Sequence, residues 1–91
     1  MSIIARIRRK ILSGQIVFSQ HVLNDKLVQF DLEQEDLLEA MLAGKVEWRG
    51  TDDPRGTVYH VACETADGLF IDVRCRFTSI QHLLIITFDE Y

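Results

Sequence analysis

The sequence contains only two cysteines and one proline, and it lacks any long apolar run. Two cysteines do not make the disulfide framework of a small secreted domain, so a cytoplasmic protein with reduced thiols is expected. No apolar run approaches the ~20 residues that span a bilayer, so no membrane partner is expected. The first ten residues do not read as a signal peptide, because their charges follow the apolar residues and no cleavage site is present.

Three kinds of chemical site are missing as well. No close-spaced ligand pair such as Cys-x-x-Cys occurs, so no metal site is expected from the histidines and cysteines, which are His21, His60, His82, Cys63 and Cys75. No glycine-rich segment precedes a helix, so a nucleotide-phosphate loop is excluded and no cofactor is expected. Covalent catalysis by cysteine is excluded if both thiols face the core.

The net charge of −4 conceals an uneven distribution of charge. Residues 1–14 hold four basic residues and no acid, whereas residues 24–53 hold nine acids and three basic residues. An acidic chain is a poor general binder of nucleic acid, because affinity for phosphates rises with the counterions released. Only a local basic patch would bind RNA, and the same asymmetry equally suits contacts with a protein partner.

The first half of the chain has the spacing of helices. Apolar residues at helical intervals predict an amphipathic helix over residues 2–13, ended by Gly14. A second helix is predicted over 20–29 with Ser19 as its N-cap, and a third over 33–43. The apolar stripe of the first helix must pack on the chain's own core or on another chain, so a homodimer or a protein partner through helix 2–13 is one possibility.

After Gly44 the apolar residues recur with a period of two. This pattern predicts strands over residues 45–49, 57–64, 69–77 and 81–88. Val46 and Trp48 are expected on one side of the first strand, and residues 50–56 are expected to form a turn. The last strand is nearly all apolar, which suits a central strand buried on both faces. The predicted fold class is therefore α+β, with N-terminal helices packed on a four-stranded antiparallel sheet in a single domain.

The hairpin between residues 57–64 and 69–77 has a register that can be argued. A tight two-residue turn at Asp67-Gly68 would place apolar and charged side chains on the same face of the hairpin. One more residue in the loop shifts the register so that the apolar side chains of both strands share one face. In that register Tyr59, Val61 and Cys63 lie beside Ile71, Val73, Cys75 and Phe77, with both thiols buried and unbonded. The opposite face then collects His60, Ala62, Glu64, Asp72, Arg74 and Arg76.

Asp72, Arg74 and Arg76 form the most informative cluster in the sequence. Two guanidinium groups two residues apart, with a carboxylate beside them, form a rigid fork suited to a phosphate or a carboxylate. The alternative is a solvated sheet face on which Asp72 partly neutralises Arg74. The anion site fails if a helix covers the two arginines, or if they pair only with Asp72 and Glu64.

Several fragments, taken in order, resemble the bacterial domain-of-unknown-function family numbered 4258. They are Ile16-Val17-Phe18-Ser19-Gln20-His21, residues 32–47, Asp53-Pro54-Arg55-Gly56 and Ile85-Ile86-Thr87-Phe88. The resemblance covers about residues 16–88. It implies a fold similar to RelE/ParE-type toxins and other small metal-independent ribonucleases. The family's His after Ser corresponds to His21, its loop Arg to Arg55 and its late Thr to Thr87. The chain departs from the family in lacking an Arg-rich stretch after His21 and in having Asp72 where the family has His.

Two functions compete. The first is a metal-independent endoribonuclease or RNA-binding domain, in which His21 or His60 is the acid or base. Its candidate catalytic residues are His21, Arg55, Arg74 and Thr87, and its candidate phosphate-binding residues are Arg55, Arg74, Arg76 and His60. The alternative is a catalytically inactive interaction module, toxin–antitoxin-like or homo-oligomeric, with Trp48 and Tyr91 as contact anchors.

Overall fold

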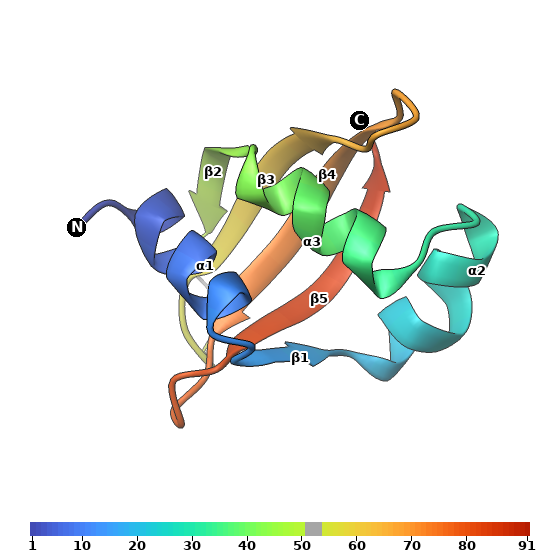
Figure 1. The fold of residues 1–91 in the computed structure, drawn as a ribbon. Coiled ribbons are helices and arrows are strands. Elements are labelled where there is room, and N and C mark those ends of the chain that lie inside the picture. Colours follow the sequence, from blue (N-terminus) through green and yellow to red (C-terminus); the bar gives the residue numbers. More distant parts are fainter. Residues whose placement is uncertain (51–53) are drawn as a thin grey trace.

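In the part of the chain that the structure describes, two of three helical segments lie on one face of a five-stranded sheet and the third lies beside it (Figure 1). The computed structural model describes residues 1–50 and 54–91, so part of the turn predicted over 50–56, and Asp53 of the family-like fragment, lie outside the described residues. The elements are α1 (Ile3–Leu12), β1 (Ile16–Phe18), η1 (Val22–Lys26), α2 (Leu27–Gln29), α3 (Gln34–Leu42), β2 (Lys45–Gly50), β3 (Val58–Glu64), β4 (Phe70–Phe77) and β5 (Leu83–Glu90). The α+β class is confirmed.

The sheet differs from the four antiparallel strands predicted. Its strand order is β1-β5-β4-β3-β2, and β1 pairs with β5 in parallel, with Ile16 opposite Leu83 and Phe18 opposite Ile85. The other three strand pairs are antiparallel, so the sheet is mixed. The sequence pattern missed β1 because a three-residue strand is too short to show a period of two.

Helix α1 closely matches its prediction. The Ser2 hydroxyl accepts a hydrogen bond from the Ala5 amide at 3.2 Å, and Gly14 adopts a φ of 75° just after the helix. Ile7 is fully buried, and the other isoleucines of the stripe, Ile3, Ile4 and Ile11, pack against the core. The apolar stripe therefore covers the chain's own core, so it no longer requires a partner chain.

The segment predicted as helix 20–29 is helical but not a regular α-helix. Ser19 caps it as expected, because its hydroxyl accepts a hydrogen bond from the Val22 amide at 3.1 Å. Its middle is the π-helix η1, in which the hydrogen-bond interval is five residues. Val22 and Leu27, which are five residues apart, are thereby both buried, whereas Leu23 is only partly buried.

Helix α3 is held at both ends. A capping box between Glu33 and Asp36 closes its N-terminus. At the other end Arg8 of α1 donates from Nε to the Leu42 carbonyl at 2.8 Å and from an Nη to the Gly44 carbonyl at 3.5 Å. A guanidinium there satisfies carbonyls that the helix leaves open and complements the helix dipole.

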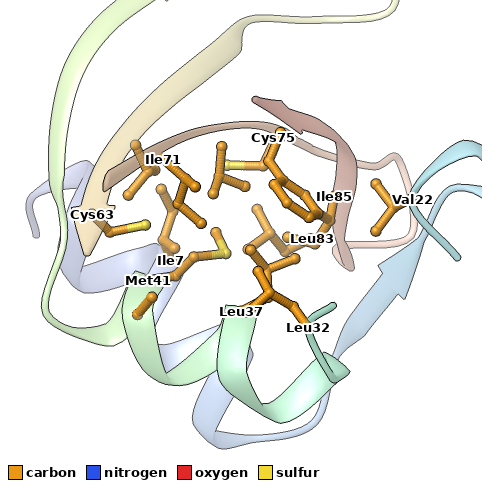
Figure 2. Packing of buried hydrophobic residues seen from close by; sticks show 14 of the residues in the cluster. Ile7, Val22, Leu32, Leu37, Met41, Cys63, Ile71, Cys75, Leu83 and Ile85 are labelled. Atoms are coloured by element: carbon orange, nitrogen blue, oxygen red, sulfur yellow. The ribbon is translucent and has the colours of Figure 1, made fainter. Parts of the chain in front are cut away.

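The core lies between the helices and the inner face of the sheet. Figure 2 shows Ile7 of α1 and Leu37 and Met41 of α3 directed toward the side chains of β4 and β5. The predicted hairpin register is confirmed, since Tyr59 pairs with Cys75, Val61 with Val73, and Cys63 with Ile71. Both cysteines are free and buried, as expected.

Two irregularities in the sheet determine which side chains reach its outer face. In β2, the register shifts between Val46 and Trp48, so Val46 pairs with Val61 and Trp48 with His60. The prediction that Val46 and Trp48 share one side is therefore wrong, because the extra residue Glu47 reverses the alternation. In β5, Arg74 pairs with Thr87 and Cys75 with Ile85, which leaves Ile86 as the extra residue.

Strand β5 lies inside the sheet but is not buried on both faces as predicted. Leu83, Ile85 and Phe88 are fully buried, whereas Leu84 and Ile86 are only partly buried. The apolar sequence of β5 thus supplies both the core and part of the outer face.

Among the residues that the structure describes, none of the helices combines the length and the apolar character that a membrane crossing requires.

Candidate functional site

The outer face of the sheet, which the helices of Figure 1 leave uncovered, carries a pocket of about 490 Å³. Its polar lining residues are Arg55, Arg74, Arg76, His60, Ser19 and Thr87. Val58, Leu84, Ile86 and Trp48 form its apolar lining. None of the described residues that line it is acidic. We call it the arginine pocket.

The arginine pocket brings together most of the residues that the sequence singled out. Three candidate catalytic residues, Arg55, Arg74 and Thr87, line it together with the two further phosphate-binding candidates, Arg76 and His60. The bulge in β5 explains the place of Thr87, because it sets Thr87 opposite Arg74. His21 is the exception.

His21 does not line the arginine pocket. Its side chain is 51% exposed, and its Nδ1 lies 3.1 Å from Oδ2 of Asp25, one turn further along the same helical segment. His60 is the only histidine among the described residues that line the pocket. We therefore leave His21 out of the candidate site and assign the acid–base position to His60.

His60 is held by a carboxylate. Its Nδ1 lies 2.9 Å from Oδ2 of Asp72, and both side chains are largely buried, at 18% and 22% exposed. With a proton on Nδ1 donated to Asp72, the imidazole keeps Nε2 as an acceptor. The sequence placed His60 and Asp72 on one face but associated Asp72 with Arg74, so it missed this pair.

The two central arginines remain accessible. Arg74 approaches Asp72 only at 4.0 Å, from Nε to Oδ2, and its side chain is 47% exposed. Within residues 1–50 and 54–91, no carboxylate lies within ion-pair distance of Arg76. The helices lie on the other face of the sheet, so the first condition for failure is not met. The second condition is met in part, because Asp72 is the one carboxylate that Arg74 pairs with among the described residues, whereas Arg76 pairs with none of them. A bound anion would meet guanidinium groups that are not already neutralised by close ion pairs.

Ser19 links the start of the helical segment after β1 to strand β5, which lines the arginine pocket. Its hydroxyl donates to the Ile86 carbonyl at 2.6 Å while accepting from the Val22 amide. Ile86 is the extra residue of the β5 bulge, whose carbonyl lies outside the regular pairing of β4 and β5. The resemblance quoted Ser19 only as part of the fragment that ends at His21. The contact of Ser19 with the sheet was not predictable from the local sequence.

Trp48 lines the pocket from the side of β2 opposite to Val46, whereas the sequence predicted both side chains on one side. Its ring meets the His60 ring edge-on, with centroids 4.6 Å apart and an interplanar angle of 90°. A Cβ at Gly50 would lie 2.7 Å from the Trp48 ring, so the indole rests where a side chain is missing. Even so, Trp48 is 58% exposed.

A second hollow of about 350 Å³ adjoins the arginine pocket on the same face. Trp48, His60 and Arg74 line both hollows. The rest of its charged lining is acidic and consists of Glu47, Asp72, Asp89 and Glu90. We call it the acidic hollow. The outer face therefore has a basic half and an acidic half, with Trp48 and His60 at their border.

Among the described residues, no group of three or more histidine, cysteine or acidic side chains is arranged to hold a metal ion.

Comparison of the chain with protein-family models, with curated proteins and with solved structures gave no match. The resemblance to the family numbered 4258 stays a prediction.

Proposed function

We propose that this protein binds RNA at the arginine pocket and cleaves a bound phosphodiester without a metal ion, with His60 as the general base. The observation that carries the proposal is the convergence of three arginines and a carboxylate-held histidine on one pocket. The chain is acidic, so binding relies on this local patch rather than on net charge.

The arginines supply the electrostatic part of the mechanism. Arg74 and Arg76 project from the same face of β4, and Arg55 reaches the pocket from the loop before β3. Guanidinium groups bind phosphate oxygens in a fixed fork and stabilise the extra negative charge of a phosphorane. The hydroxyl of Thr87, opposite Arg74, donates to a non-bridging oxygen of the same phosphate.

His60 supplies the proton transfer. Its Nε2 takes the proton of the ribose 2′-hydroxyl, and O2′ forms a bond to phosphorus. The bond from phosphorus to O5′ breaks, and the leaving O5′ takes a proton from water. The hydroxide formed takes up the proton from His60 and restores the neutral imidazole. The products are a 2′,3′-cyclic phosphate and a 5′-hydroxyl end. Asp72 stabilises the imidazolium that forms, because its Oδ2 already lies at hydrogen-bond distance from Nδ1.

The experiment is cleavage and binding of unstructured RNA at low salt with EDTA present. The Arg74→Ala/Arg76→Ala variant is compared with Arg9→Ala/Lys10→Ala, which removes two positive charges from the end of α1. We expect the first variant to bind RNA much more weakly and to lose cleavage, and the second to keep both activities. Absence of any RNA binding by the unmodified protein, or equal binding by the two variants, contradicts the proposal. Binding without cyclic-phosphate products limits the function to RNA binding.

A further inference from the structure

We infer that Trp48 is a stacking platform for an unpaired base, so that the arginine pocket selects single-stranded over double-stranded RNA. This inference rests on the proposed function and specifies its substrate class.

The ring of Trp48 is exposed and yet held in place. It lies on the edge strand β2, at 58% exposure, where a large aromatic side chain gains little from the core. Gly50 leaves room beneath it, since a Cβ there would lie 2.7 Å from the ring. The perpendicular His60 ring, with its centroid at 4.6 Å, also contacts it. An aromatic ring positioned before binding loses little conformational entropy when a ligand stacks on it.

The charges around Trp48 orient a bound nucleotide. On one side Arg74 and Arg76 attract a phosphate, and on the other Glu47 and Glu90 repel it. Asp89, in the same hollow, is paired with Lys26. The phosphate is therefore expected in the arginine pocket, with the attached base toward Trp48 and the acidic hollow. Trp48 and His60 line both hollows, so a base stacked on Trp48 also keeps its ribose close to His60.

A base within a duplex cannot reach this position. Both of its faces are already stacked on neighbouring bases, and its edge is paired. Proteins that recognise single-stranded RNA stack such bases on aromatic side chains, and one stacked base changes affinity by a factor of about five to a hundred. The predicted substrate class is therefore single-stranded RNA, with at least one base unstacked over Trp48.

The chain contains one tryptophan, so tryptophan fluorescence reports on this position alone. The test titrates the protein with a single-stranded RNA oligonucleotide and with a duplex that contains the same sequence. We expect the single strand to quench Trp48 and to bind at least about fivefold more tightly than the duplex. Trp48→Ala should lose about five- to a hundredfold in affinity for the single strand, whereas Trp48→Phe should retain most of it.

Three outcomes overturn the inference. They are equal affinity for the two RNAs, unchanged fluorescence at saturation, and unchanged affinity in Trp48→Ala. If Arg74→Ala/Arg76→Ala still abolishes binding in any of these cases, the proposed RNA-binding function stands and only the stacking platform fails. If the unmodified protein binds neither RNA, the proposed function fails with it. Trp48 is largely exposed, so thermal unfolding of Trp48→Ala and Trp48→Phe is expected to match the unmodified protein and serves as the folding control.

Discussion

His60 and Asp72 form a hydrogen-bonded pair across the hairpin of β3 and β4, with 2.9 Å between Nδ1 and Oδ2. They are not direct partners in the sheet, since His60 pairs with Arg74 and Asp72 with Ala62. The diagonal contact fixes the imidazole by its Nδ1 side and leaves Nε2 without a protein partner among the described residues. In the proposed mechanism, Asp72 is a positioning residue for His60 rather than a ligand of the RNA.

The first prediction concerns this pair. His60→Gln should reduce cleavage by about 10²- to 10⁴-fold, the usual contribution of a general acid–base group, while RNA affinity changes little. Asp72→Asn should also reduce the cleavage rate, because an amide can donate to Nδ1 and favour the tautomer with the proton on Nε2. Glu64→Gln, which removes an exposed carboxylate from the same strand pair, is the control and should cleave normally. Normal cleavage by Asp72→Asn would show that the pair is structural only.

The second prediction concerns the salt dependence of binding. Each phosphate contact to a single strand contributes about 0.7 to the slope of log affinity against log salt concentration. Loss of two contacts in Arg74→Ala/Arg76→Ala should therefore make the slope shallower by about 1.4. Arg9→Ala/Lys10→Ala removes the same formal charge from the opposite side of the sheet and should leave the slope unchanged. A similar change in both variants would indicate diffuse attraction instead of a phosphate site.

The third prediction follows from the two buried thiols. Burial, together with the nearby Asp72 carboxylate, raises the pKa of Cys63 and of Cys75 from 9.0 to about 12. Between pH 9 and pH 12 the unfolded chain loses its thiol protons while the folded chain retains them. The free energy of unfolding therefore falls as the pH rises above 9. The slope approaches about 1.4 kcal/mol per pH unit for each thiol once the unfolded thiols are ionised. Urea unfolding at pH 8 to 11 measures it.

The control for this measurement is Cys63→Ala/Cys75→Ala. The variant should be less stable at pH 8, because it leaves space in the core, but its stability should depend less steeply on pH. If the free energy of unfolding fell equally steeply with pH in the two proteins, groups other than the two thiols would cause the loss of stability at alkaline pH.

The fourth prediction concerns the link between α1 and α3. Arg8→Ala should lower the free energy of unfolding by about 1.5–3 kcal/mol, because the charged donor at the end of α3 is lost. Arg9, its exposed neighbour, makes no such contact among the described residues, and Arg9→Ala should change stability by less than about 0.5 kcal/mol. Urea unfolding of both variants tests the difference, and equal values would contradict a capping role for Arg8.

The parts of the fold that could be predicted are the helices and strands along which apolar residues recur at regular intervals. The alternation in β3 and β4 fixed the hairpin register, because a slip of one residue would have buried Arg74 and exposed Val73. The same alternation placed His60, Arg74 and Arg76 on one face before the structure was known. Helix α1 was predictable for a similar reason, since its isoleucines recur every three or four residues.

The parts of the site that escaped prediction depend on interruptions of these periods. A single extra residue, Glu47, moves Trp48 to the outer face, and the extra Ile86 sets Thr87 opposite Arg74. Such bulges are decided by the pairing of distant strands and leave no local signal in the sequence. Ser19 reaches the site for the same reason, because its partner Ile86 is 67 residues away.

The last prediction tests the support beneath Trp48. Gly50→Ala places a methyl group 2.7 Å from the original ring position, which forces the indole to move because the ring end of the side chain is the freer partner. We expect changed tryptophan fluorescence in the unbound protein, weaker binding of single-stranded RNA and little change in stability. A double-mutant comparison isolates the cause, because Gly50→Ala should have no further effect on affinity in the Trp48→Ala background. An equal loss of affinity in both backgrounds would place the effect of Gly50 in the strand itself, independent of the ring.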